Sequence, residues 1–299
     1  MGAGSLQPSG SRLVGGPRHR RRVAVNRLVE AGCTLAAILA VAVLALVVIS
    51  VLIKGLPALN LGFFTQEPAP FGQPGGGIAN SIVGSAILVG LATAISVPVG
   101  IMVAVYTTQF AGPRVAGAIR FALDILNGVP TIVTGVFIFG LMVVGNQQSG
   151  WAAAVALAIV ELPIVARSAQ EVLALVPRSL QEAGLALGLR RWRIVVRIVV
   201  PTAAGGLITG AVLGVARVAG ETAPLLFTSS IFSDLGITTS PSQAMPNIPV
   251  TIFSLSESPA PADHARAWAA ALVLILFVLL LSVVARAFHE RTRRRLTGR

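Results

Sequence analysis

Two charged residues, Arg217 and Glu221, stand four positions apart inside an apolar stretch of this 299-residue chain. On one helix, residues at i and i+4 share a face, so the two side chains can pair. A charge at the centre of a membrane span costs at least about 2.5–3.5 kcal/mol, so Arg217 is expected to face a cavity or a partner. A guanidinium offers a planar, permanently charged fork to an oxyanion. The pair predicts either a structural ion pair or an anion site, and we favour the anion site.

Small residues continue the helical face that carries this pair. The face reads, at intervals of three or four residues, Gly206, Gly210, Gly214, Arg217, Glu221 and Pro224. Glycines at such spacing allow the backbones of membrane helices to approach closely. We therefore expect this face to pack against protein rather than lipid.

Uncharged polar residues provide further candidates for the path of an anion. They are Asn127 and Thr131 in one apolar stretch and Thr222 beside the charged pair. Each of them can line a path or simply bond to neighbouring backbone. Pro130, which follows Gly128, is expected to kink its span.

The remaining intramembrane charges have simpler interpretations. Asp124 is four residues from Arg120, a spacing that favours a structural ion pair. Glu161 is about one and a half turns from Arg167 and is expected to anchor the inner end of its span.

Composition identifies the class of protein. The chain is 55% hydrophobic and only 11% charged, which excludes a soluble globular domain and indicates a polytopic membrane protein. A net charge of +12 is also typical of nucleic-acid binding. Aromatic residues are only 5%, however, and the basic residues cluster beside apolar spans. We therefore predict that the basic residues anchor the chain in a lipid bilayer and bind no nucleic acid.

Six apolar segments are long enough to cross a hydrocarbon core of roughly 30 Å. They cover about residues 29–53, 80–107, 119–144, 151–168, 200–228 and 265–287. The predicted fold is all-α, a polytopic membrane protein with six transmembrane helices. Residues 1–25 are rich in Gly, Ser, Pro and Arg, and this composition predicts a disordered basic tail.

The distribution of basic residues predicts the orientation. Apart from Lys54, Arg217 and Arg266, the lysine and arginine residues lie in the N-terminal tail, the second loop, the fourth connection or the C-terminal end. Cytoplasmic segments carry such an excess. Both termini, including the basic tail 288–299, and the connection at 170–200 are therefore predicted to be cytoplasmic.

The chain lacks the residues for catalysis of its own. It has no Gly-x-x-x-x-Gly-Lys-Ser/Thr phosphate loop, and its single lysine, Lys54, is on the predicted outer side. Its three histidines are far apart, and no cluster of metal ligands or Ser/His/Asp array is visible. We predict that it is not an enzyme, has no catalytic residue, metal or cofactor, and draws energy from a partner or an ion gradient.

The cytoplasmic connection has the punctuation of an ordered helix–turn–helix. Pro177 ends what precedes it, and Ser179 with Glu182 has the capping-box spacing. Gly188 can take the left-handed conformation that ends a helix. A second, arginine-rich helix is then predicted to run to Pro201. An ordered helix pair at this place indicates a docking site.

The same segment resembles the EAA loop, the coupling helix by which permeases of ABC importers contact their ATPases. It reads Glu182-Ala183-Gly184, three residues, Gly188, nine residues, then Ile198-Val199-Val200-Pro201. The family has alanine in place of Gly184 and leucine in place of Val200, and the spacing is kept. The resemblance implies that Ser179, Glu182, Ala183, Gly184 and Gly188 couple the chain to an ATPase.

Four further segments resemble the PstA family, the permease subunits of phosphate importers in the bacterial inner membrane. They are residues 127–133, 162–167, 216–228 and 247–253. The resemblance implies the type I importer permease (MetI-like) fold, with a permease domain at about 80–287. It also implies a heterodimer with the sister permease PstC, two copies of the ATPase PstB and the phosphate-binding protein PstS.

The resemblance implies that Arg217, Glu221, Thr222, Asn127 and Thr131 line the path of phosphate. Chemistry alone accepts other oxyanions, such as molybdate or sulfate. An ion-coupled secondary transporter is the alternative from another class, and it usually contains an internal repeat, of which the sequence shows none.

Overall fold

The computed structural model describes residues 17–231 and 236–297. Within these ranges the regular elements are helices, and the only other pairing is an isolated bridge between Pro68 and Gly76. The predicted all-α class is confirmed. The chain divides into two compact units, residues 1–50 and 51–299.

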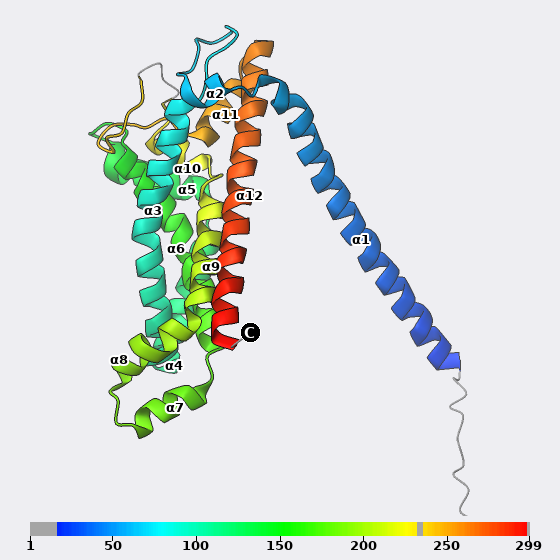
Figure 1. Cartoon of the computed structure of the whole chain (residues 1–299), viewed down its shortest axis with the longest axis vertical. Coiled ribbons are helices and arrows are strands. Elements are labelled where there is room, and N and C mark those ends of the chain that lie inside the picture. The colour runs from blue at the N-terminus through cyan, green and yellow to red at the C-terminus, as the bar shows by residue number, and fades with distance from the viewer. Residues whose placement is uncertain (1–16, 232–235, 298–299) are drawn as a thin grey trace, which may run out of the picture. The chain divides into compact units, whose positions relative to one another are not determined.

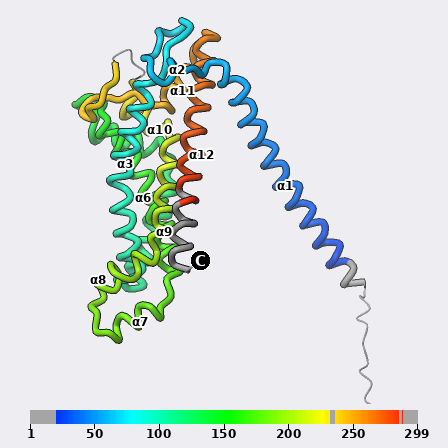
Figure 2. The backbone as a smooth tube through the Cα atoms, in the orientation of Figure 1, coloured from blue at the N-terminus to red at the C-terminus, as the bar shows by residue number. Residues whose placement is uncertain are grey.

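The first unit contains most of helix α1, Pro17–Gly55 (Figures 1 and 2). The predicted span 29–53 lies within this helix. Residues 17–25 are helical, although the sequence indicated disorder for 1–25, and residues 1–16 lie outside the described part. The difference has a simple reason. Nucleating a helix is costly but extending one is cheap, so a long apolar helix can continue into a polar flank.

The second unit is built around α6, Gly150–Ala174. Beside it stand α3, Ala79–Val105, and α9, Val200–Val218, and α12, Pro261–Thr297, packs against α9 (Figure 2). Helix α6 packs against α3 and α9, and its first half is rich in buried alanines. Small side chains bring the neighbouring backbones close, which fixes the positions of the polar groups between them.

The predicted third span is two helices rather than one kinked helix. Helix α4, Pro113–Gly128, and helix α5, Thr131–Ile138, are bent by 94° relative to each other, and α5 continues as a π-helical turn, Phe139–Val143. Pro130 has no N–H to donate, and it disfavours helical dihedrals at Val129, which is extended at φ −68° and ψ 128°. The described residues thus contain five helices long enough to span a membrane, or six if this pair counts as one.

The predicted fifth span is also broken. Helix α9 ends at Val218, and a shorter helix, α10, covers Ala223–Thr228. At its other end α9 is longer than expected, because α8, Arg191–Ile194, and a π-helical turn, Val195–Val199, run into it without a gap. The arginine-rich helix predicted to run to Pro201 continues directly into α9. Pro201 lies inside this continuous helix, directly after the π-helical turn, and such a turn is one of the places where a helix accommodates an interrupted hydrogen-bond ladder.

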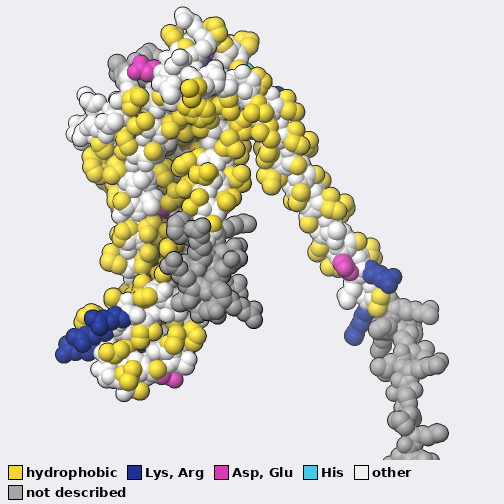
Figure 3. Space-filling model, viewed as in Figure 1, with side chains coloured by type: hydrophobic (Ala, Val, Ile, Leu, Met, Phe, Trp, Pro, Cys, Tyr) yellow, Lys and Arg dark blue, Asp and Glu magenta, His cyan; other side chains and the backbone are white. Residues whose placement is uncertain are grey.

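The bundle has two distinct ends. The α7 end carries α7, Arg178–Ala186, and α8. The opposite α11 end carries a 3₁₀ turn, Leu56–Ala58, with α2, Leu61–Thr65, and α11, Ile248–Ser256 (Figure 1). Apolar side chains cover the visible face between the two ends, and basic side chains gather at the α7 end (Figure 3).

Candidate functional site

The predicted pair of Arg217 and Glu221 forms in the structure, and its two members differ in exposure. An Nη of Arg217 contacts Oε1 of Glu221, as the spacing predicted. The arginine side chain is 57% exposed and the glutamate side chain 7% exposed. The guanidinium is therefore open to whatever occupies the space beside α9, while the carboxylate is held by protein.

Glu221 lies beyond the end of the helix rather than on it. Arg217 occupies the last turn of α9, and residues 219–222 form the break before α10. The backbone N–H of Glu221 donates to the Val218 carbonyl at 3.1 Å, which closes a turn after the helix. Thr222 follows in the N-cap position of α10, and its own carbonyl accepts from Leu225 at 3.1 Å. The break thus brings Arg217, Glu221 and Thr222 to one place.

The short helix after this break packs against the short helix after the other break. An ideal Cβ on Gly135 of α5 would lie 2.6 Å from Cα of Pro224 in α10, so only glycine permits this approach. The rings of Phe139 and Phe227 meet edge to face, 6.3 Å apart. Two interrupted helices therefore meet beside the charged pair. Breaks of this kind expose backbone groups, which membrane proteins tolerate where a cavity or other protein covers them.

The other two predicted path residues lie on either side of the first break. Thr131 begins α5 and is half-buried, while Asn127 is in the last turn of α4 and is exposed. In the parts of the chain that the structure describes, neither side chain hydrogen-bonds to Arg217 or Glu221. An apolar cavity of about 420 Å³ opens at this bend. Its lining is Leu126, Val129, Val133, Thr134, Phe137, Ile159 and Leu162.

The predicted glycine face packs against α6. An ideal Cβ would lie 2.4 Å from Val172 at Gly206, 2.3 Å from Ser168 at Gly210, and 2.9 Å from Val165 at Gly214. None of these positions has room for a side chain. Close packing of this face is confirmed, and it places α9 firmly against the central helix.

The two helices at the α7 end, α7 and α8, are joined by an ordered turn. Gly188 has φ +73°, the left-handed conformation that the sequence predicted. Its N–H donates to the Leu185 carbonyl at 2.9 Å, and the Leu189 N–H donates to the Gly184 carbonyl at 3.1 Å. These two bonds form a Schellman motif, which satisfies carbonyls at the helix end. Gly184 is buried, and an ideal Cβ there would lie 3.0 Å from Ile194.

The predicted capping box does not form. Helix α7 begins at Arg178, directly after Pro177, and no side chain caps its first turn. Ser179 is therefore already inside the helix, two residues past the N-cap position, which Pro177 occupies. Ser179, Glu182 and Ala183 are instead exposed on the surface of α7, where a partner can contact them.

Two intramembrane carboxyl groups contact neighbouring helices rather than the arginines closest to them in sequence. Asp124 contacts Arg167 of α6 rather than Arg120 of its own helix, and Arg167 also donates to the Arg120 carbonyl at 3.2 Å. Glu161 is fully buried and accepts from the Thr93 hydroxyl instead of pairing with Arg167. In both cases a neighbouring helix supplies the partner, which spacing within one helix does not reveal.

A buried ion pair that was not predicted lies at the α11 end. Asp263 contacts Arg266, and the two side chains are 0% and 6% exposed. Asp263 also accepts from the Gly72 N–H at 2.9 Å, and Arg266 donates to the Ala69 carbonyl at 2.8 Å. The pair therefore ties the segment before α3 to the start of α12. The i, i+3 spacing of the two charges was the available signal.

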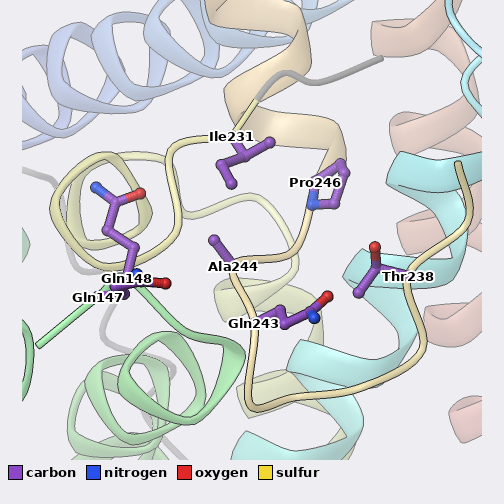
Figure 4. A pocket seen from close by; sticks show the side chains of 7 residues that line it. All are labelled: Gln147, Gln148, Ile231, Thr238, Gln243, Ala244 and Pro246. Atoms are coloured by element: carbon purple, nitrogen blue, oxygen red, sulfur yellow. The ribbon is translucent and has the colours of Figure 1, made fainter. Parts of the chain in front are cut away.

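A polar pocket of about 510 Å³ also lies at the α11 end. Figure 4 shows its lining, which is Gln147, Gln148, Ile231, Thr238, Gln243, Ala244 and Pro246. Gln148 is held on both sides of its amide, because it accepts from the Ser230 N–H at 2.9 Å and donates to the Phe227 carbonyl at 3.3 Å. The adjacent glutamines Gln147 and Gln148 are the feature of the sequence that could have indicated this pocket.

A bundle of apolar helices, two of them interrupted, with an ordered helix pair at one end is the architecture of a membrane transport protein. Residues 96–296 match the family described as "Binding-protein-dependent transport system inner membrane component", and the chain belongs to this family. The predicted class of importer permease is thereby confirmed.

Curated relatives narrow the comparison. The chain is 40% identical over 242 residues to "Phosphate transport system permease protein PstA" of Yersinia pestis, which covers 80% of this chain and 81% of the relative. It is 38% identical over 229 residues to the protein of the same name from Mycobacterium leprae, covering 75% and 74%.

Solved structures support the fold. An inward-facing MetNI methionine ABC transporter matches with a TM-score of 0.56 at 19% identity, covering 72% of this chain and 95% of that chain. A bacterial alginate ABC transporter matches with a TM-score of 0.60 at 14% identity, covering 93% and 97%. The predicted MetI-like permease fold is confirmed.

Proposed function

We propose that this chain is the permease subunit of an ATP-driven importer of inorganic phosphate, and that Arg217 contacts the phosphate in transit. The observation that carries the proposal is the exposed guanidinium of Arg217 at the end of α9, paired on one side only with a buried carboxylate. Relatives with about 40% identity are phosphate permeases by name, and this supports the choice of anion.

The exposure of Arg217 indicates where the path runs. A charged side chain that is 57% exposed in the apolar bundle would face lipid if this unit stood alone, at a cost of about 2.5–3.5 kcal/mol or more. That cost is avoided if water and a second permease subunit cover this face. We infer that the sister permease, PstC in the relatives' system, completes the path opposite Arg217. Thr222, Thr131 and Asn127 would then line it near the two breaks.

Glu221 has a distinct role in this path. Because its carboxylate is buried, it can hold the guanidinium at the path without itself facing the anion. It also competes with phosphate for the same donors, which weakens anion binding. A transported anion must be bound tightly enough to enter and weakly enough to leave, and a paired arginine meets both requirements.

Energy would come from a separate ATPase that docks at the α7 end. The exposed surface of α7 carries Ser179, Glu182 and Ala183, and the turn at Gly188 holds this surface in place. We propose that two copies of the ATPase PstB bind the permease pair here. In that arrangement both termini are cytoplasmic, the chain spans the bacterial inner membrane, and the phosphate-binding protein PstS delivers phosphate at the α11 end.

A continuous helix begins at α8, which follows the docking surface on α7, and reaches Arg217. From Arg191 to Val218, α8, the π-helical turn and α9 form one span of 28 residues, about 42 Å at 1.5 Å per residue. Movement of the docked ATPase can therefore be transmitted along a single element to Arg217. This geometry supports alternating access driven by ATP rather than by an ion gradient.

The test is uptake of labelled phosphate by the complete complex in ATP-loaded vesicles, with sulfate and molybdate as competitors. Arg217→Gln removes the charge and is expected to abolish uptake while the complex still assembles. Arg114→Gln is the matched control, because Arg114 is an exposed arginine at the start of α4. Near-normal uptake by Arg217→Gln would refute the role of Arg217. Stronger competition by sulfate or molybdate would identify another oxyanion, and uptake without a bound ATPase would indicate a secondary transporter.

A further inference from the structure

A buried carboxyl group in the middle of the bundle has no role in the path described above. Glu161 of α6 is 0% exposed, and the Thr93 hydroxyl donates to its two oxygens at 3.3 and 3.4 Å. The ion pairs formed by the described side chains do not include it, so no cation compensates Glu161 in this state. An isolated acid in a membrane span is costly and marks a function by default.

The packing of α9 on α6 places Glu161 close to the level of Arg217. The facing positions are Gly206 with Val172, Gly210 with Ser168, and Gly214 with Val165 and Glu161. Residue numbers rise on α9 as they fall on α6, so the two helices are antiparallel. Arg217 follows Gly214 by three residues, about 4.5 Å along the axis and on nearly the same face. An arginine side chain is longer than that step.

Glycine at position 214 lets the carboxyl group of Glu161 pack directly against the backbone of α9. An ideal Cβ at Gly214 would lie 3.2 Å from Oε1 of Glu161, which is closer than ordinary contact. The carboxyl group of Glu161 therefore lies at the α9 backbone about one turn before Arg217.

The direction of helical side chains favours the same contact. Long side chains on a helix lean toward its N-terminus and cover the preceding turn. For Arg217 that turn contains Gly214, against which Glu161 lies. In the present state Arg217 instead contacts Glu221 on its C-terminal side, away from that turn.

We propose that Arg217 alternates between two carboxyl partners during transport, Glu221 in the present state and Glu161 in the opposite one. The exchange withdraws the guanidinium from the path into the α6–α9 interface and so releases the anion. The proposal rests on the transport function proposed above and assigns Glu161 as a positioning residue that acts through Arg217 without touching the anion.

The test uses the full complex in vesicles and the variant Glu161→Gln. Glutamine keeps the shape of the side chain and an oxygen for Thr93, but it offers no charge to Arg217. Glu171→Gln is the matched control, because Glu171 is an exposed glutamate on the same helix. Measurements are the maximal rate and KM of ATP-dependent phosphate uptake, the yield of assembled complex and its thermal midpoint.

We expect Glu161→Gln to lower the maximal rate at least about tenfold with little change in KM, because release rather than capture of the anion is impaired. Assembly and thermal midpoint should match wild type. Glu161→Asp, which restores a carboxyl group, should recover part of the rate, and Glu171→Gln should transport normally.

Three results would overturn the proposal: a wild-type maximal rate for Glu161→Gln, loss of assembly in that variant, or no recovery by Glu161→Asp. Loss of assembly counts against it because a mere packing role would then explain the residue. Failure of the wild-type complex to take up phosphate is a separate outcome, because it refutes the proposed substrate. The maximal rates of the wild type and the Glu161 variants would then be compared with the anion that the complex does transport.

Discussion

Replacement of Gly188 by alanine isolates the contribution of one backbone turn to ATPase docking. Gly188 has φ +73°, and an added Cβ would meet nothing within 4 Å. Steric crowding therefore does not contribute, and the cost of the change is the left-handed backbone itself. For an L-residue that cost is roughly 1–2 kcal/mol.

The cost sets the size of the expected effect. The turn at Gly188 orients α7 relative to α8, and the strained variant can relax only by giving up the Schellman bonds of Leu189 and Gly188. If the ATPase requires the ordered turn, the strain appears in the docking equilibrium. At 1.36 kcal/mol for each factor of ten, Gly188→Ala should weaken binding of the ATPase by about 5- to 30-fold. Gly188→Asn should weaken it less, because asparagine enters this conformation more readily.

The assay is titration of the solubilised permease complex with the ATPase subunit, together with the amount of ATP hydrolysed per phosphate imported. Gly117→Ala is the control, because Gly117 lies in helix α4 and an added Cβ there also meets nothing within 4 Å. Equal binding by the glycine, asparagine and alanine forms at position 188 would show that docking does not need the turn. An equal loss in Gly117→Ala would show that the effect is not specific to it.

Two further predictions concern stability and are measured by thermal unfolding in detergent. Gly84→Ala should destabilise the protein by about 1–3 kcal/mol, because its Cβ would lie 1.9 Å from a carbonyl oxygen. Gly90→Ala on the same helix is the control, because its Cβ meets nothing within 4 Å, and it should be neutral or stabilising. Equal thermal midpoints for the two variants would contradict the packing at Gly84. Asp263→Asn leaves the buried Arg266 without its charge partner and should lower the free energy of unfolding by about 3 kcal/mol. Asp124→Asn, in a pair whose aspartate is 60% exposed, should lower it by under about 1 kcal/mol. The reverse order would show that the Asp263 pair is not effectively buried.

Features that depend on a few neighbouring residues were predictable. The length of the apolar runs, the left-handed turn at Gly188 and the pairing of Arg217 with Glu221 all follow from local spacing. The close packing of the face at Gly206 also follows, because only a partner helix can fill such a surface. The family resemblance in the coupling segment is local for the same reason.

Other features needed the fold, because they depend on the register between helices that are distant in sequence. Local spacing offered Arg120 as the partner of Asp124, but α6 brings Arg167 closer. Local spacing placed Glu161 near Arg167, but in the structure the Thr93 hydroxyl of α3 donates to Glu161. The sequence predicted a kink where α4 ends and a continuous span where α9 ends, because a helix end inside an apolar stretch leaves little trace in the composition.

The amino-acid sequence by itself therefore determined that this chain is a helical membrane protein with a charged pair beside a glycine-lined face, because hydrophobic length and i, i+4 spacing are local properties. The tertiary structure alone decided where the two carboxyl groups near this face lie. It put Glu221 beyond a helix end and Glu161 against Gly214. The antiparallel packing of α9 on α6 sets that arrangement, and no spacing along a single helix contains it.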